Sequence, residues 1–326
     1  MSYTIYFFRK RESDKSGGVL SSVRNILGGT SIAGNLDKEM LRFLSQFGHF
    51  PGPEPVADGF DAGYLNLDTG TQFFLNLHRS QIPELENEVR FPGYEFTGLT
   101  CTMNCCRPLY FMLEAAPVIE KIARKFNLEI LNDTDLHKAS SPRICMAHEL
   151  IMSYEKANTT AVREMAKSMG NGSNEVLSGT DPRNYLPTEK TMFWWEYMFN
   201  RDDIRAQLEE HQIELYVPEL MVMKRKSDGE LLTMMALSEG VGYLMPPSDM
   251  FYILRNNDTE EGFIIASDLL QHLGPYLIQT TILNKTFNVL STEKAKEFAQ
   301  TLKQIPLMPV SGMFTGVQPG NFVDVR

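Results

Sequence analysis

The sequence predicts an α+β protein of two domains: an N-terminal ferredoxin-like unit, with helices packed on a sheet, and a second domain of helices and antiparallel strands. The chain has 326 residues, which is more than one hydrophobic core usually fills. In its first part, segments with a two-residue apolar period alternate with segments of helical period. A polar, turn-rich stretch at 132–141 follows. We therefore place the domains at residues 1–132 and 142–326.

The strands of the N-terminal domain are predicted by alternation and by β-branched or aromatic residues, and its helices by apolar residues three and four apart. Asn35 or Asp37 can cap the first helix, which is expected to end at Gly48. Residues 12–35 are rich in Ser and Gly and predict a surface loop. The expected strands are residues 3–8, 63–67, 71–78, 96–105 and 128–131, and the second expected helix is 110–126.

The second domain is predicted to begin with a long helix from Pro142 to about residue 169, because proline suits the first position of a helix. A further helix begins at Thr188. The Asp228-Gly229 turn predicts a β-hairpin between residues 214–225 and 230–237. The remaining expected elements are a strand at 249–254 and helices at 267–273 and 291–304, before a tail from residue 306.

The composition is that of a folded, acidic protein. Hydrophobic residues make up 43% of the chain, which is enough apolar material to exclude an intrinsically disordered protein. Lys and Arg number 31 against 41 Asp and Glu, a formal net charge of −10. This balance argues against nucleic acid as a partner, because phosphate contacts need clustered basic residues. It is a hint of a basic protein partner, whose association an acidic surface accelerates.

No segment approaches the roughly 20 apolar residues that a membrane-spanning helix needs, so no membrane contact is expected. The start of the chain places its apolar run before Arg9, whereas a signal peptide places positive charge first. Four cysteines are too few for a disulfide framework in a chain of this length. The sequence therefore predicts a cytoplasmic protein with reduced thiols, and it leaves the oligomeric state open.

Five residues come closest to a metal-binding pattern: Cys101, Cys105, Cys106, Cys145 and His148. Zinc needs four donors around one point. Cys101 and Cys105 lie on one expected strand, about 13 Å apart at roughly 3.3 Å per residue, so they cannot hold one ion without a bend. Cys145 and His148 lie one helical turn apart but supply only half a site. Buried structural cysteines are the favoured interpretation, and no metal or cofactor is expected.

Short catalytic signatures do not occur in the sequence. The nucleophile pattern G-x-S-x-G and the phosphate-loop patterns are absent, and His148 is followed by Met152 where a zinc protease needs a second histidine. Asp133, Asp135 and His137 stand at alternate positions near the expected domain boundary. They could hold a divalent ion or transfer protons, and a solvated turn with an Asx cap explains them as well. No catalytic residue is assigned.

Both tryptophans of the chain stand side by side in the helix expected to begin at Thr188. Adjacent side chains on a helix point about 100° apart, so this aromatic surface is too wide for one buried stripe. We expect one tryptophan to fill the core between the domains and the other to be partly exposed. Because exposed aromatic residues often anchor interfaces, Trp194, Trp195 and Tyr197 are the candidate interface residues.

The first domain resembles a group of bacterial proteins. The opening Met1-Ser2-Tyr3-Thr4-Ile5-Tyr6-Phe7-Phe8 resembles proteins that begin with a strand of the form M-S-Y-x-[IL]-Y-F. The segment from Phe96 through Arg107-Pro108 to Ala115 is similar to a run in uncharacterised bacterial proteins, some of which are regarded as immunity or accessory proteins of toxin-delivery systems. The similarity spans about residues 1–132. It implies a protein that masks a toxin.

Two classes of function remain. The first is a cytoplasmic, non-enzymatic binding protein, such as an immunity protein, that masks a basic toxin or enzyme through shape and acidic charge. The alternative is an enzyme that acts on a small molecule in a cleft between the domains, where pockets often form. The absence of short catalytic signatures favours the first class.

Overall fold

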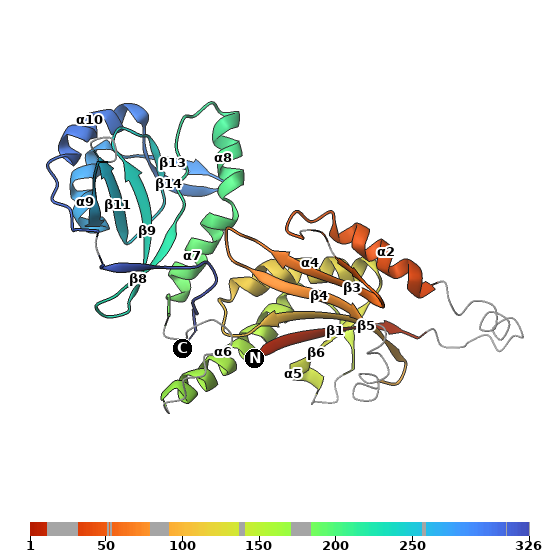
Figure 1. Ribbon diagram of the computed structural model, residues 1–326. Helices are drawn as coiled ribbons and strands as arrows, with labels where there is room; N and C mark the ends of the chain where they lie inside the picture. Colours follow the sequence, from red (N-terminus) through yellow and green to blue (C-terminus); the bar gives the residue numbers. More distant parts are fainter. Residues whose placement is uncertain are drawn as a thin grey trace, which may run out of the picture. The chain divides into compact units, whose positions relative to one another are not determined.

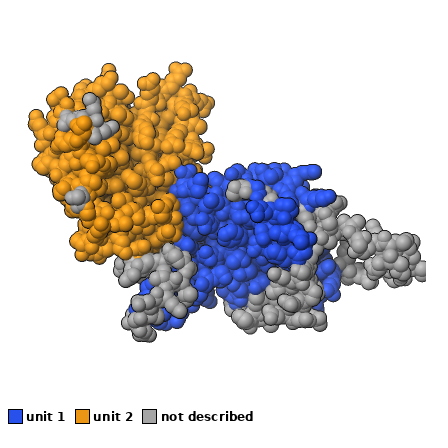
Figure 2. Space-filling model, in the orientation of Figure 1, with its two compact units in different colours: residues 1–180, 326 blue, residues 181–325 orange. Residues whose placement is uncertain are grey.

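The computed structural model describes residues 1–11, 32–50, 52, 54–78, 91–136, 141–170, 184–255, 259–310 and 312–325. It confirms the α+β class, with helices and mostly antiparallel sheets. The chain divides into two compact units, residues 1–180 with residue 326 and residues 181–325 (Figure 2). Within the described ranges, no helix is both long enough and apolar enough to cross a membrane.

Unit 1 is built on one antiparallel sheet (Figure 1). The first strand, β1, lies inside this sheet and pairs with β5 on one side and with β6 on the other. The strands follow the spatial order β2-β3-β4-β5-β1-β6-β7, where β1 is Ser2–Lys10, β2 Glu54–Val56, β3 Gly59–Leu65, β4 Gln72–His78, β5 Tyr94–Asn104, β6 Glu129–Asn132 and β7 Arg143–Ile144. The two edge strands β2 and β7 are additional to the strands expected from the sequence. The ferredoxin-like arrangement stays a prediction for this larger sheet.

Helices cover one face of the unit 1 sheet. The alternate residues Tyr3, Ile5 and Phe7 of β1 are buried beneath them. The ring of Tyr3 meets the ring of Tyr154 in α6 edge to face, with the centroids 5.6 Å apart. α4 and α6 also pack against each other (Figure 1). The helices of unit 1 are α2 (Ile32–Leu44), α4 (Tyr110–Lys125), the single turn α5 (Asp133–Leu136) and α6 (Ala147–Gly170).

The boundary between the units lies after Thr180, so our placement at 132–141 is wrong. The reason is α6, which the sequence pattern assigns to the second domain but which completes unit 1. Tyr154 donates a hydrogen bond to the backbone oxygen of Asn104 (3.1 Å). The buried Asn158 accepts the backbone N–H of Cys106 (2.7 Å) and donates to the backbone oxygen of Arg107 (2.6 Å). These bonds fasten α6 to the end of β5.

Two helices begin at positions other than those expected. α6 begins at Ala147 rather than Pro142, because residues 143–144 form β7 and pair with β6. α2 begins at Ile32, so Asn35 and Asp37 lie inside that helix instead of capping it. Of the expected loop at 12–35, residues 12–31 lie outside the described residues.

Unit 2 contains two sheets. The larger has the order β12-β11-β9-β8-β15 and is antiparallel except for the pair β9–β11, and the smaller has the order β10-β14-β13. The strands are β8 (Met221–Arg225), β9 (Leu231–Ser238), β10 (Tyr243–Met245), β11 (Met250–Arg255), β12 (Glu260–Ile265), β13 (Ile278–Ile282), β14 (Lys285–Leu290) and β15 (Phe314–Val317). The helices are α7 (Thr188–Phe199), α8 (Arg201–Glu210), α9 (Ala266–Leu273), η1 (Gly274–Tyr276) and α10 (Thr292–Leu302).

The two ends of unit 2 are paired with each other. Val323 forms a parallel bridge with Tyr185, and its N–H donates to the backbone oxygen of Asn184 (2.9 Å). The side chain of Thr188 donates to the backbone oxygen of Asp324 (2.7 Å). Phe322 is fully buried. The last described residues of the chain are therefore part of the unit 2 core, beside the residues that lead into α7.

Candidate functional site

Unit 2 contains a cavity of about 200 Å³. It lies where α7 and α8 face the hairpin of β13 and β14, and we call it the apolar groove. Phe193, Glu196, Tyr197 and Asn200 follow helical spacing, so they share one side of α7. The lining residues are Phe193, Glu196, Tyr197, Asn200, Ile204, Ile282, Leu283, Lys285 and Phe287.

Tyr197 forms the deep wall of the groove and is fixed by a hydrogen bond and a ring contact. Its hydroxyl donates to the backbone oxygen of Pro218 (2.7 Å), and its ring lies 6.2 Å from the ring of Phe287. Burial raises the pKa of Tyr197 above that of an exposed tyrosine. The hydroxyl therefore stays protonated and bound within unit 2, and the ring carbons are the surface that a ligand would meet.

The opposite wall is the β13–β14 hairpin. Leu283 and Asn284 form its turn with φ values of 49° and 62°, and positive φ at both central residues is typical of a type I′ turn. Ile282 pairs with Lys285, and Thr280 with Phe287. Because side chains alternate along a strand, Ile282, Lys285 and Phe287 share the face that lines the groove.

The polar groups at the rim pair with each other. Lys285 and Glu196 form an ion pair across the groove. The Asn200 side chain donates to the backbone oxygen of Glu196 (2.6 Å). The backbone N–H of Leu283 donates to Oε1 of Gln207 in α8 (3.3 Å), which ties the hairpin tip to that helix. The groove thus combines six aliphatic or aromatic side chains with three polar ones, two of which form an opposite-charge pair.

The size of the groove limits what it can hold. Pockets for drug-sized ligands and cofactors usually have volumes of about 300–1,000 Å³, and this cavity has about 200 Å³. That volume is comparable to one large apolar side chain. Interfaces commonly seat one such side chain in a desolvated pocket, where it contributes much of the binding energy. The groove therefore matches an anchor residue of a partner better than a cofactor.

The three candidate interface residues take different positions on α7. Trp194 is 1% exposed, donates to the backbone oxygen of Leu220 and packs edge to face on Phe322. It belongs to the core of unit 2, as does Tyr197 at 2% exposed. Trp195 is half-buried, and its ring lies 5.6 Å from Phe199, which is 45% exposed. A role of Trp195 in an interface stays a prediction.

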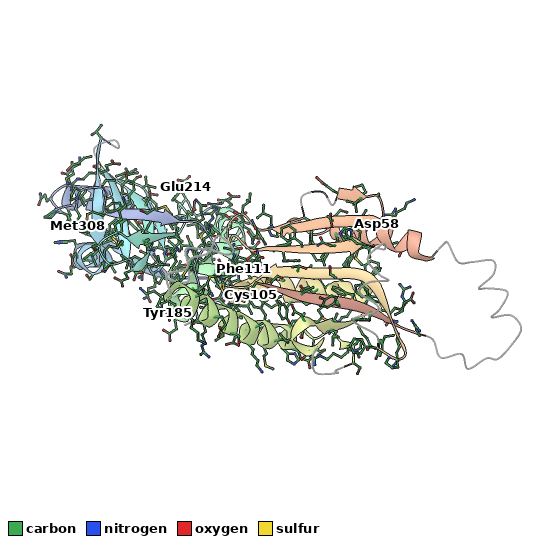
Figure 3. The ribbon with its side chains drawn as sticks, turned by 60° about the horizontal axis from the view of Figure 1, so that its bottom comes forward. Asp58, Cys105, Phe111, Tyr185, Glu214 and Met308 are labelled. Atoms are coloured by element: carbon green, nitrogen blue, oxygen red, sulfur yellow. The ribbon has the colours of Figure 1, made fainter. Side chains whose placement is uncertain are left out.

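All four cysteines lie buried in unit 1. Cys105 directly follows β5 and precedes α4, the helix that contains Phe111 (Figure 3). Burial raises the pKa of Cys105 and of Cys145 to about 12, and it raises the pKa of Cys101 further. Cys145 is buried while His148 is exposed, so the two do not form a pair. Among the described residues, no group of three or more His, Cys, Asp or Glu side chains could hold a metal ion.

These thiols predict an alkaline loss of stability in unit 1. A raised folded-state pKa means that the folded state keeps protons which the unfolded state releases above about pH 8.5. The contribution of the thiols to the free energy of unfolding is therefore fully present below that pH. It is lost as the pH rises toward 12, by about 1.4 kcal/mol per pH unit for each thiol. Urea unfolding at pH 8, 9 and 10, followed by circular dichroism, measures this slope.

The sequence provides an internal control for that measurement. Both tryptophans lie in unit 2 and all four cysteines in unit 1, so tryptophan fluorescence identifies the transition of unit 2. The double variant Cys101→Ala, Cys145→Ala should lose about half of the slope of unit 1, because Cys105 and Cys106, whose pKa values are also raised by burial, remain. An unchanged midpoint of the unit 1 transition between pH 8 and 10 would contradict burial of these thiols.

The acidic residues of the turn that follows β6 form hydrogen bonds and an ion pair with other residues of unit 1. Asp133 accepts the backbone N–H of Thr4 (2.9 Å). Asp135 accepts from the side chain of Asn132 (3.1 Å) and lies 3.3 Å from the guanidinium of Arg143. Asn132 in turn accepts the backbone N–H of Asp135 (3.0 Å), which is the Asx cap that the sequence allows. His137 lies outside the described residues, and whether the group binds an ion or transfers protons stays a prediction.

Comparison with known proteins gave no match, whether the chain was compared with family models, with curated proteins or with solved structures.

Proposed function

We propose that this protein is a non-enzymatic binding protein whose apolar groove receives a large apolar side chain of a partner protein. The groove carries the proposal, because six of its nine lining residues are aliphatic or aromatic and its volume of about 200 Å³ suits one side chain. Its walls are already ordered: Tyr197 is bound to Pro218, and the hairpin tip is bound to Gln207. An ordered pocket loses little conformational entropy when a partner enters it.

The acidic balance of the chain supports a basic partner. The net charge of −10 speeds encounter with a basic protein, and this gain falls as salt increases. A toxin that the protein masks in the cytoplasm is the partner implied by the resemblance of residues 1–132 to immunity proteins. The alternative is an enzyme that acts on a small molecule in a cleft between the domains.

Leu283→Asp is expected to weaken partner binding strongly without disturbing the fold. Leu283 is 42% exposed at the mouth of the groove, and its positive φ suits aspartate better than leucine. The substitution puts a charge where an apolar side chain should enter. When the tagged protein is purified from its source organism, a basic protein should co-purify in stoichiometric amount. The Leu283→Asp variant should co-purify with at most about a tenth of that amount.

A matched control separates the groove from general surface changes. Leu270 in α9 is 40% exposed in the same unit and lies outside the groove, so Leu270→Asp should retain the partner as the unchanged protein does. The captured protein is then purified, and its affinity is measured by calorimetry at two salt concentrations. Equal retention by all three proteins, or no stoichiometric partner, would contradict the proposed function.

A further inference from the structure

β13 is an open edge of the smaller sheet in unit 2. In the order β10-β14-β13, β13 pairs with β14 on one side, and no strand among the described residues pairs with its other side. The opposite edge is covered, because Tyr216 bridges β10. Its N–H donates to the backbone oxygen of Gly242 (2.9 Å), and its oxygen accepts from Leu244 (3.0 Å).

The register shows which backbone groups of β13 are free to pair. Ile282 and Lys285 flank a two-residue turn, so they form a hydrogen-bonded pair. Hydrogen-bonded and non-bonded pairs alternate along an antiparallel ladder. The backbone N–H and C=O groups of Thr281 and Gln279 therefore point away from β14, toward the open edge.

Sheet edges elsewhere in the described chain carry features that discourage pairing. β2 is three residues long and contains Glu54 and Pro55, and β7 is two residues long and contains Arg143. β12 is covered by Met308, with hydrogen bonds of 2.9 and 2.8 Å to Phe263. β15 has four residues and includes a glycine, which weakens a strand.

β13 has the opposite character. Its sequence, Ile-Gln-Thr-Thr-Ile, contains β-branched residues and neither a charge nor a proline. Its last residue, Ile282, lines the apolar groove, and Ile278 on the same face is 57% exposed. An added strand on this edge would extend the face that forms the groove, so edge and groove form one continuous surface.

The helix beside the hairpin tip is acidic. Asp203 and Glu210 stand four residues before and three residues after Gln207, so they share its side of α8. Both are exposed. Within the described chain neither makes an ion pair, whereas Arg205 pairs with Asp202. A partner strand would therefore meet two unneutralised carboxylates beside the groove.

We infer that the partner binds by adding an extended strand to β13, with an apolar side chain in the groove and Lys or Arg two residues away on the same face. This inference rests on the proposed function. The free backbone groups of Thr281 and Gln279 supply the pairing that such a strand needs. A second copy of this chain is the poorer occupant, because two chains of charge −10 repel each other.

The test uses a seven-residue peptide of alternating threonines, with a central phenylalanine and a lysine two residues to either side of it. Binding to the full-length protein is followed by amide chemical shifts. Thr281→Pro removes the outward N–H of β13, and Thr281→Val keeps it at similar volume. We expect Thr281→Val to bind the peptide as the unchanged protein does and Thr281→Pro to bind about tenfold more weakly, with thermal unfolding verifying that both variants fold.

Each further result has a defined meaning. Equal binding by both Thr281 variants would overturn strand addition and leave the groove intact. A peptide with glutamates in place of lysines that binds equally well would overturn the basic preference. A peptide with alanine in place of phenylalanine that binds equally well would overturn the apolar anchor, and with it the proposed function. If the protein dimerises and Thr281→Pro abolishes the dimer, a second copy of this chain occupies the β13 edge. That result would overturn the proposal of a partner strand.

Discussion

Trp194→Ala is expected to lower the free energy of unfolding of unit 2 by about 3–5 kcal/mol, whereas Trp195→Ala is expected to cost about 1 kcal/mol or less. Trp194 is 1% exposed, packs on Phe322 and donates to the backbone oxygen of Leu220. Its removal leaves a large cavity and an unpaired carbonyl. Trp195 is half-buried beside Phe199, so its removal takes away less buried apolar surface.

Urea unfolding measures both effects, because each variant keeps one tryptophan as a fluorescent reporter of unit 2. Partner capture adds a second readout for Trp195→Ala. If that variant unfolds normally but retains less partner, the exposed face of α7 belongs to the interface. If both substitutions only destabilise unit 2, the interpretation of Trp195 as an exposed anchor is wrong.

Glu114→Ala is expected to destabilise unit 1 by about 3–5 kcal/mol. Glu114 lies in α4, is 5% exposed and accepts three side-chain hydrogen bonds: from Tyr64 (3.0 Å), Asn66 (3.1 Å) and Thr71 (2.9 Å). These donors come from β3 and the turn that leads into β4, so the carboxylate fastens that turn to the helix. Alanine would leave all three donors buried without this acceptor.

A graded series tests the role of Glu114. Glu114→Gln keeps one side-chain oxygen as an acceptor and should cost about half as much as alanine, because one donor group replaces the other oxygen. Lys125→Ala, an exposed change near the end of the same helix, should cost under about 0.5 kcal/mol. Circular dichroism in urea separates the three. Equal stabilities for Glu114→Ala and Lys125→Ala would show that the hydrogen bonds contribute nothing net.

The sequence predicts elements well where the local pattern is strong. The alternation of residues 71–78 places β4 within one residue of its observed start, and the apolar stripe of 110–126 places α4 equally well. Both patterns report burial on one face, which a single segment records by itself. Asp228-Gly229 likewise marks the turn between β8 and β9.

The sequence fails where contacts join distant segments. A polar stretch at 132–141 looks like a linker, but the bonds of Asn158 to residues 106 and 107 keep α6 in unit 1. The β13–β14 hairpin escapes prediction because its turn is Leu283-Asn284 instead of a glycine-containing pair. The groove could not be predicted either, since Phe193 and Phe287 come together only in the folded chain. The donors to Glu114 are hidden in the same way.

The pairing of Val323 with Tyr185 has a consequence for synthesis of the protein. Phe322 fills the core against Trp194, so unit 2 cannot complete its core until the ribosome has released the residues that follow all of its other elements. Apart from residue 326, unit 1 consists of residues 1–180, so it can fold while unit 2 is still being made. During that interval the α7 tryptophans and the uncapped sheet edges are open to other chains. Unit 2 is therefore the part of the protein most dependent on rapid completion or on chaperones.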